Sequence, residues 1–208
     1  MMPFTDRLRQ QFDDKAAVIE ALRRYFVVDG DVFTGSRFEL VADAEHPDTF
    51  TAKDLVAVSM LSVEVPARVA YWLLSTEGQL ATCPLLAQVP TTVDIWDTEA
   101  ESLLAEGGPL WILWNLLACA SWPQPVSGNG MGPTTISKLL AAKRPRLVPV
   151  WDSVVERAVG SIDEMWPGMR DALLDDDLRE LIVRATATAP PHVSLLRRID
   201  VVVWSLNR

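Results

Sequence analysis

Two glycines in front of a predicted helix form the segment of this 208-residue sequence that is best suited to chemistry. Gly130 and Gly132 flank Met131, and Pro133 follows directly. Glycine lets the backbone turn tightly, and proline is favoured at the first position of a helix. The first amides of a helix have no partner within it, so they can bind a phosphate oxygen. The spacing predicts an anion-binding turn before a helix over residues 134–143, with a plain tight turn between two helices as the alternative.

The residues after these glycines carry a local excess of positive charge. The whole chain has 28 acidic and 19 basic residues and a net charge of −9, which argues against a generally basic nucleic-acid-binding surface. Within residues 138–157, however, basic residues outnumber acidic ones: they are Lys138, Lys143, Arg144, Arg146 and Arg157. This local island predicts phosphate contacts, and a solvated helix face is the alternative.

A carboxylate with an aromatic neighbour lies inside the same segment. Asp152 precedes a predicted helix over residues 152–159, and aspartate is a preferred N-terminal cap. A carboxylate also suits the cleavage of a glycosidic bond, because it stabilises the positive charge that develops on the sugar. Trp151 lies directly before Asp152 and offers an aromatic surface. Capping alone is the alternative role of Asp152, and the two roles are compatible.

Together these residues resemble the hairpin of helix-hairpin-helix DNA-binding modules, and in particular the base-excision DNA glycosylases of that superfamily. Asp152 follows Gly132 by twenty residues and Arg157 follows Asp152 by five, and the glycosylases place an aspartate and commonly an arginine at these spacings. The resemblance implies a helix-hairpin-helix over about residues 110–145 and a catalytic Asp152. It implies a base pocket at Trp151 and DNA binding by Gly130, Gly132, Thr134, Thr135, Lys138, Lys143 and Arg144.

Departures from the glycosylase pattern narrow the implied mechanism. The lyase-type enzymes carry a lysine two residues after the second glycine, where this chain has Thr134, so a Schiff base at that position is excluded. Val154 replaces the family's histidine, and two cysteines are too few for the four-cysteine iron–sulfur cluster. The implied activity is therefore a monofunctional, lysine-independent base excision that uses no metal and no cofactor.

The whole chain also resembles an uncharacterised family of actinobacterial proteins, most clearly in residues 50–60, 137–145 and 192–204. That resemblance brings no activity with it. It leaves open a catalytically inert helical protein that binds another protein or a small ligand. A third alternative is an enzyme unrelated to DNA that uses the acidic N-terminal region, whose carboxylates and histidine suit a metal ion. These are Asp29, Asp31, Glu39, Asp43, Glu45, His46 and Asp48. The same acidic residues also suit a mimic of DNA charge, and a plain solvated loop is the alternative to both.

Hydrophobic spacing predicts a mainly helical protein of two lobes meeting around the hairpin. Residues 1–50 are expected to form an N-terminal helix (5–26), a β-hairpin around Asp29-Gly30 and an acidic loop with a short strand at 38–41. Residues 51–208 are expected to form the helical domain. Its helices are predicted at 51–61, 66–74, 97–105, 110–120, 134–143, 152–159, 171–187 and 192–206.

The cellular setting predicted from the sequence is the cytoplasm. The longest apolar run, residues 110–120, is shorter than a membrane span, and the charged N-terminus lacks the apolar core of a signal peptide. Two cysteines exclude a disulfide framework. We therefore expect no membrane contact, and DNA or a protein as the partner.

Overall fold

The computed structural model describes residues 2–26, 33–119 and 131–208, and within these ranges it is helical and contains no strand. The mainly helical fold class is confirmed. The N-terminal part holds α1 (Phe4–Gln10), α2 (Lys15–Phe26), a short 3-10 helix η1 (Thr34–Arg37) and α3 (Phe38–Val41). The middle part holds α4 (Ala52–Met60), α5 (Ala67–Leu74), α6 (Thr76–Leu86), α7 (Thr98–Leu104) and α8 (Pro109–Cys119). The C-terminal part holds α9 (Pro133–Lys143), α10 (Ser153–Val159), η2 (Ile162–Glu164), α11 (Met165–Leu174), α12 (Asp176–Ala185) and α13 (Leu195–Asn207).

Two predictions for the N-terminal region need correction. Residues 38–41 form a helix and not a strand, because Phe38 turns inward and the amide of Ala42 bonds back to its carbonyl. The predicted β-hairpin covers residues 26–33. Its residues 27–32 lie outside the described residues, and its first residue, Phe26, is the last residue of α2. The single helix predicted over 5–26 is also divided, because the chain turns between α1 and α2 around Asp14, whose carboxylate accepts the amides of Ala16 and Ala17.

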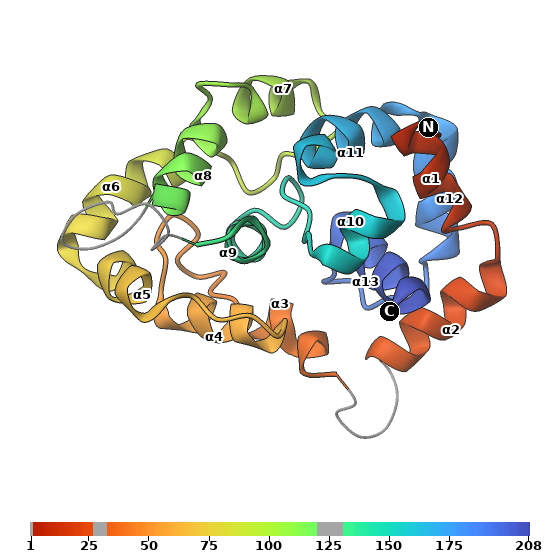
Figure 1. Ribbon diagram of the computed structural model, residues 1–208, viewed down its shortest axis with the longest axis horizontal. Helices are drawn as coiled ribbons and strands as arrows, with labels where there is room; N and C mark the ends of the chain where they lie inside the picture. Colours follow the sequence, from red (N-terminus) through yellow and green to blue (C-terminus); the bar gives the residue numbers. More distant parts are fainter. Residues whose placement is uncertain (1, 27–32, 120–130) are drawn as a thin grey trace.

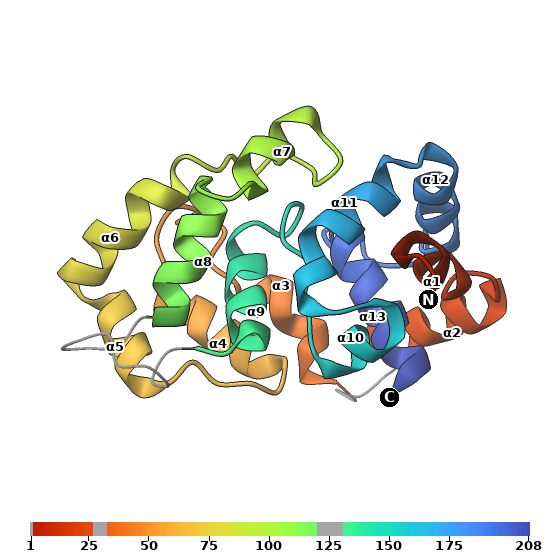
Figure 2. The same cartoon turned by 45° about the horizontal axis from the view of Figure 1, so that its top comes forward.

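The helices form two groups with α9 between them (Figures 1 and 2). One group contains α4 to α8, and the other contains α1, α2 and α10 to α13. Although α1 and α2 begin the chain, they pack against its C-terminal helices: α1 contacts α10 and α11, and α2 contacts α13. On the other side, α9 packs against α4 and α8. The start of α9 and the residues that follow this helix are therefore held at the junction of the two groups.

Local signals in the sequence explain several helix ends near this junction. Thr51 and Asp54 form a capping box at the start of α4, and Pro133 begins α9 after Gly132. Asp152 caps α10, as predicted. Apolar side chains from both groups join one continuous core, whose completely buried members include Leu73, Leu113, Leu139, Leu173 and Val202. The core fixes α9 and α13 rigidly, and these helices carry the polar residues described next.

Candidate ligand pocket

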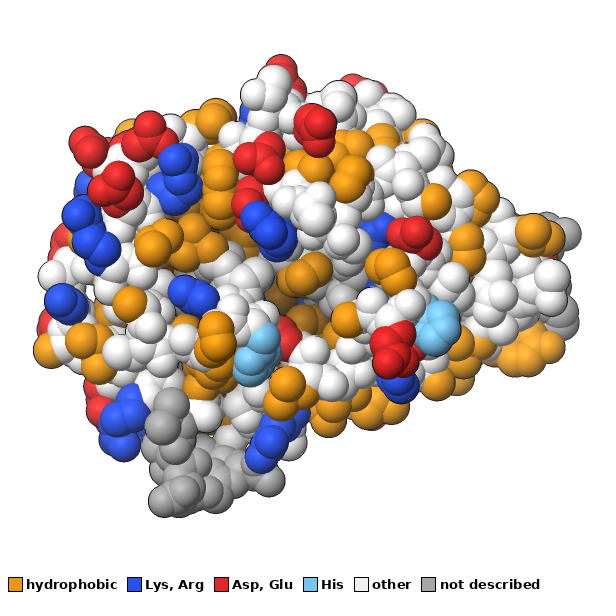
Figure 3. Space-filling model, turned by 180° about the vertical axis from the view of Figure 1, so that it is seen from behind, with side chains coloured by type: hydrophobic (Ala, Val, Ile, Leu, Met, Phe, Trp, Pro, Cys, Tyr) orange, Lys and Arg blue, Asp and Glu red, His pale blue; other side chains and the backbone are white. Residues whose placement is uncertain are grey.

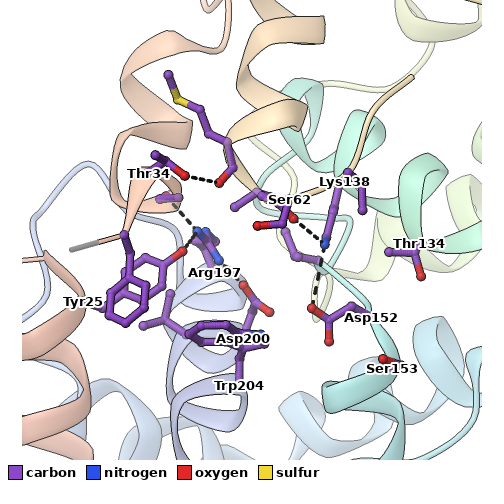
Figure 4. Close-up of a pocket in the computed structure, with 17 residues that line it drawn as sticks. Tyr25, Thr34, Ser62, Thr134, Lys138, Asp152, Ser153, Arg197, Asp200 and Trp204 are labelled. Carbon is purple, nitrogen blue, oxygen red and sulfur yellow. Dashed lines mark hydrogen bonds and ion pairs between the residues drawn. The ribbon is translucent and has the colours of Figure 1, made fainter. Parts of the chain in front are cut away.

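A pocket of about 480 Å³ opens where α9, the start of α10 and α13 meet the loop after α4. Charged, polar, aromatic and aliphatic side chains all line it (Figure 4). Its polar and aromatic lining is Tyr25, Phe33, Thr34, Ser62, Thr134, Lys138, Asp152, Ser153, Arg197, Asp200 and Trp204. These residues come from α2, η1, α9, α10 and α13, so only the folded chain brings them together.

Asp152 divides its carboxylate between a structural and an open role. Oδ1 accepts the amides of Val154 at 2.9 Å and Val155 at 3.1 Å, which caps α10. Oδ2 is not used in the cap and lies 3.8 Å from Lys138 Nζ. The side chain keeps 18% of its surface exposed and lines the pocket. The cap therefore orients the carboxylate and leaves one oxygen for a ligand.

Lys138 reaches the pocket from α9, one helical turn after Thr134. Its ammonium donates to the carbonyl of Leu61 at 2.9 Å and faces Asp152, and the residue is 4% exposed. Burial lowers the pKa of Lys138 below its ordinary value, while the carboxylates of Asp152 and Asp200 oppose the shift. The amine is therefore desolvated yet held between two acids.

The loop that receives this amine contains a strained residue. Ser62 follows Leu61 and has a φ of 61°, a conformation that residues other than glycine rarely adopt. Such strain persists only where neighbouring contacts fix the backbone, and it is concentrated at functional sites. Here the bond from Lys138 to the Leu61 carbonyl holds the loop against the pocket.

On the opposite wall, α13 contributes a buried ion pair. Arg197 bonds to Asp200, one turn away on the same helix, and also to Glu39, to the hydroxyl of Tyr25 and to the carbonyl of Gly35. These partners accept four hydrogen bonds from the guanidinium, and the nearby acids raise its pKa against the effect of burial. Arg197 therefore joins α13, α2, η1 and α3 rather than offering a free charge.

The surroundings of Asp200, on the same wall, shift the pKa of its carboxyl. Burial raises its pKa to about 6, with Arg197 opposing and Asp152 adding to the increase. In Figure 4, Asp200 and Asp152 approach the centre of the pocket from different helices. A pair of acids in different environments beside a buried amine is typical of a functional site.

Three aromatic residues form a further part of the wall. Tyr25 and Phe33 are stacked with ring centroids 5.3 Å apart, and Phe33 meets Trp204 edge to face at 5.6 Å. All three line the pocket. The sequence predicted this role for Trp151, but Trp151 lies in the core, 1% exposed and stacked on Phe4, and does not line the pocket. Its backbone instead bonds to Ser137 of α9, which fixes the position of Asp152 next to it.

Two of the predicted DNA-binding cations lie in the interior. Lys143 directs its three hydrogens to Asp54 at 2.6 Å and to the carbonyls of Asp43 and His46, and both charged side chains are completely buried. Asp54 in turn accepts the backbone amides of Asp43 and Thr51. The pair joins α9 to α4 and to the loop between α3 and α4, so a DNA phosphate has no access to the Lys143 amine.

The guanidinium of Arg144 is likewise fully hydrogen-bonded within the protein. Its five donors bond to the carbonyls of Val89, Leu86, Pro47 and Lys143 and to the carboxylate of Asp48. The side chain therefore binds carbonyls at and just after the end of α6 and holds the loop before α4. Both residues correct the expectation of phosphate contacts and equally the alternative of a solvated helix face, because a short basic segment does not indicate which side of a helix faces the core.

The remaining predicted DNA contacts lie at the start of α9. Gly130 lies outside the described residues. Gly132 is the N-terminal cap residue of α9, and a Cβ added to it would meet open space. Thr134 lines the pocket, whereas Thr135 is half-buried beside it and does not. Thr134 at the start of α9 and Asp152 thus line one pocket.

The acidic N-terminal region forms one local cluster within the described residues. Asp43, Glu45 and His46 place their ligand atoms within 4.8 Å of one another. The carboxylate of Asp43 already accepts from the Glu45 amide, from Thr51 and from His46. Hydrogen bonding to Thr51 and His46 lowers the pKa of Asp43 although burial opposes it. The cluster is thus explained as a turn that closes the loop before α4.

Several residues of the pocket were missed by the sequence reasoning. Arg197 and Asp200 lie in the long apolar segment of α13, which we predicted only as an apolar face. Two opposite charges three residues apart within such a face were the available signal, because charged side chains are rarely buried unless they are paired. Tyr25 and Ser62 gave no comparable signal, since only tertiary contacts bring them to the pocket.

In the part of the chain that the structure describes, no helix combines the length and the apolar character needed to cross a membrane. Comparison with known proteins gives a family but no activity. Residues 18–207 match the model of a family described as being of unknown function. No curated protein matches the chain. No solved structure matches it. The family match includes every residue named above as lining the pocket.

Proposed function

Because the chain belongs to this family of unknown function, DUF6308, whose description names no activity, we propose a function from the pocket alone: it binds a neutral, planar, polar ligand of nucleobase or nucleoside type. The observation that carries the proposal is the placing of Asp152 Oδ2 and Lys138 Nζ, 3.8 Å apart, inside a pocket that Trp204 also lines. Polar groups held in a mostly apolar pocket are the usual means of fixing a ligand's orientation.

The charges of the pocket favour a neutral ligand. Its lining contains two cations, Lys138 and Arg197, and two acids, Asp152 and Asp200. Arg197 is occupied by protein partners, and Lys138 faces carboxylates. An anion would have to compete with these acids for the cations. A neutral ring with its own donors and acceptors satisfies Asp152 and Lys138 without separating charges.

The aromatic residues favour a planar ligand. Trp204, Phe33 and Tyr25 are placed by α13, η1 and α2, so a ring that enters between them and Asp152 meets apolar surface on one side and polar groups on the other. Stacking on an aromatic side chain contributes roughly 1–3 kcal/mol per base in nucleic-acid-binding proteins. The pocket volume of about 480 Å³ lies within the range of small-molecule sites.

The proposal is tested by thermal unfolding with a panel of adenine, guanosine, adenosine, uracil and uridine. At least one compound is expected to raise the midpoint of the wild-type protein and to leave that of Asp152→Asn unchanged. Asparagine caps a helix as well as aspartate does, so this variant keeps its fold. The matched control is Asp175→Asn, which alters the capping residue of α12, away from the pocket.

Two results would count against this function. One is a panel in which no compound stabilises the wild type at millimolar concentration. The other is a compound that stabilises Asp152→Asn as much as it stabilises Asp175→Asn, because the ligand would then bind elsewhere. Charged relatives such as adenosine 5′-monophosphate are expected to bind more weakly than adenosine, since the pocket has no free cation among the described lining residues.

A second candidate function, DNA base excision, is favoured by the position of Asp152. The residue caps α10 twenty positions after Gly132, and its free oxygen faces a pocket that Thr134 of α9 also lines. In this function the bound ring is a base turned out of DNA, and Asp152 orients the water that attacks the sugar as the bond to the base breaks. DNA binding then depends on backbone amides at the start of α9, since Lys143 and Arg144 are internal.

This second function is tested by incubating the protein with duplexes that carry uracil, hypoxanthine or an alkylated base. Base release by the wild type, lost in Asp152→Asn and kept in Asp175→Asn, is the expected result. Free nucleosides that bind without any base release would leave the small-ligand function as the one supported. Salt-sensitive binding to abasic DNA is expected to accompany base release.

A further inference from the structure

A second pocket, on the side of the molecule away from Asp152, gathers arginines. It also measures about 480 Å³ and lies between α12, the start of α13 and the loops that hold Asp94 and Arg146. Figure 3 shows this side of the molecule, where Lys and Arg side chains stand around a hollow with apolar side chains in its floor. Four arginines line the pocket against two acids: Arg146, Arg179, Arg184 and Arg198 against Asp94 and Glu180.

Arg198 is the arginine of this pocket best placed to bind a ligand. It is half-buried, and its Nε donates to the carbonyl of Val193 at 2.9 Å, which fixes the side chain. Its Nη atoms have no hydrogen-bond partner, and the residue no acidic partner, among the residues that the structure describes. Burial lowers the pKa of Arg198, as expected for a partly desolvated cation without a nearby acid.

The other three arginines each have an acidic partner. Arg184 lies 3.6 Å from Glu180, and both side chains are about 70% exposed, so water screens the pair. Arg179 pairs with the exposed Asp176, whereas Arg146 bonds through two nitrogens to Asp94, whose side chain is 15% exposed. The exposed pair of Arg184 is weak, and this arginine can turn toward a stronger anion. Arg179 also lies over the ring of Trp96 at 5.5 Å, which holds its guanidinium at the pocket.

From this geometry we propose that the pocket of Arg198 binds a small phosphate-bearing molecule, with Arg198 and Arg184 as its principal ligands. The planar fork of arginine matches the oxygens of a phosphate group, which therefore completes the unused donors of Arg198. Trp96 lines the same pocket and holds Arg179 over its ring, which adds a further guanidinium near the bound group. This binding is independent of the function proposed for the pocket of Asp152.

The surrounding charge selects a small molecule over an extended polyanion. Asp175, Asp176 and Asp177 begin α12, and Glu180 follows one turn later beside the pocket. A compact phosphate compound can enter between the arginines without meeting the three aspartates at the start of α12, whereas a DNA backbone that extends along α12 would be repelled by them.

The test is a calorimetric titration of the full chain with inorganic pyrophosphate, ADP and a 20-base-pair duplex. Wild type is expected to bind pyrophosphate and ADP, more weakly as salt rises. Arg198→Gln is expected to weaken binding by about tenfold or more, and Arg184→Gln by about threefold, because each removes a charged hydrogen bond. Arg23→Gln is the control, since Arg23 pairs with Glu20 on α2 and does not line the pocket.

The proposal is overturned by a wild type that binds neither pyrophosphate nor ADP, or by duplex DNA that binds more tightly than either and loses this binding in Arg198→Gln. It is equally overturned if both arginine variants bind as the wild type does. Arg184 is an exposed residue, so its variant keeps the fold and gives a result even if Arg198→Gln unfolds. ADP that binds more tightly than pyrophosphate identifies a nucleotide as the source of the phosphate.

Discussion

At the scale of single residues, the chemistry of this protein depends on which charges are buried with partners and which are not. Lys143 and Arg144 were predicted to bind DNA, and both are internal, with every donor occupied. The side chains of Lys138 and Asp152 are 5% and 18% exposed, but both line a pocket, where their polar atoms can contact a ligand. The sequence presents all four as neighbours in one segment. Only the direction of each side chain on α9 and α10 separates the structural charges from the functional ones.

The structural role of Lys143 predicts a large loss of stability when it is removed. Lys143→Met leaves the carboxylate of Asp54 buried without its cation, and breaking a buried pair in this way costs about 3–5 kcal/mol. Chemical denaturation measures the change. The exposed Lys53→Met is the control and should change the free energy of unfolding by less than about 0.5 kcal/mol. Lys143→Met combined with Asp54→Asn should recover part of the lost stability. A double variant with a lower free energy of unfolding than Lys143→Met alone would disprove the pairing.

The perturbed acid of the pocket predicts a pH dependence of stability. The pKa of Asp200 is about 6 in the folded chain against an ordinary value of 3.8, so the folded state holds the proton more tightly. The free energy of unfolding contributed by this group therefore falls as the pH rises from about 4 to about 6. The other shifted carboxyls of the described residues, Glu20, Asp43 and Asp175, have lowered pKa values, so their contributions have the opposite sign and are complete once the pH exceeds their ordinary values of 4.5 and 3.8.

Urea unfolding of wild type and Asp200→Asn at pH 4.5 and pH 7 measures this effect. The asparagine variant does not titrate, so its stability relative to the wild type is expected to increase between the two pH values. A difference that stays constant, or that moves the other way, would show that Asp200 remains ionised throughout and that its pairing with Arg197 outweighs its burial.

At the scale of elements, spacing and caps predicted the helices well where one face is apolar and the first residue is a good cap. The capping box of α4, the aspartate at the start of α10 and Pro133 in α9 are confirmed. The prediction omitted α6, because Gly78 and Pro84 lie within it and both disfavour helix. It also merged α11 with α12, whose boundary at Asp175 depends on a cap in the middle of an acidic run. Neither the pocket nor its aromatic wall follows from such local rules.

The start of α9 gives a prediction that separates folding from binding. Gly132 has a φ of −70°, and a methyl group added there meets open space, so Gly132→Ala should leave the thermal midpoint unchanged. If the first amides of α9 bind a DNA phosphate, the same methyl group would obstruct that contact and weaken binding to abasic duplex. A marked loss of stability in Gly132→Ala would contradict the geometry of this turn.

At the scale of the whole molecule, two groups of helices meet around α9 (Figure 2), and a pocket with a partly polar lining opens beside this helix. The mainly helical class and the membership of an uncharacterised family agree with what the sequence indicated. The glycosylase resemblance stays a proposal, supported by the approach of Thr134 and Asp152 to one pocket. The net charge of −9 could not show that a local arginine pocket exists, because charge totals carry no information on position.

Ligand binding in the pocket between α9, α10 and α13 is tested most directly by following indole and amide resonances by NMR during a titration with adenosine and uridine. Binding there is expected to shift the resonances of the Trp204 indole and of the amides of Ser62 and Thr134, with the Trp111 and Trp166 indoles unchanged. Shifts confined to Trp111 and Trp166, or no shift at any of these groups, would contradict it.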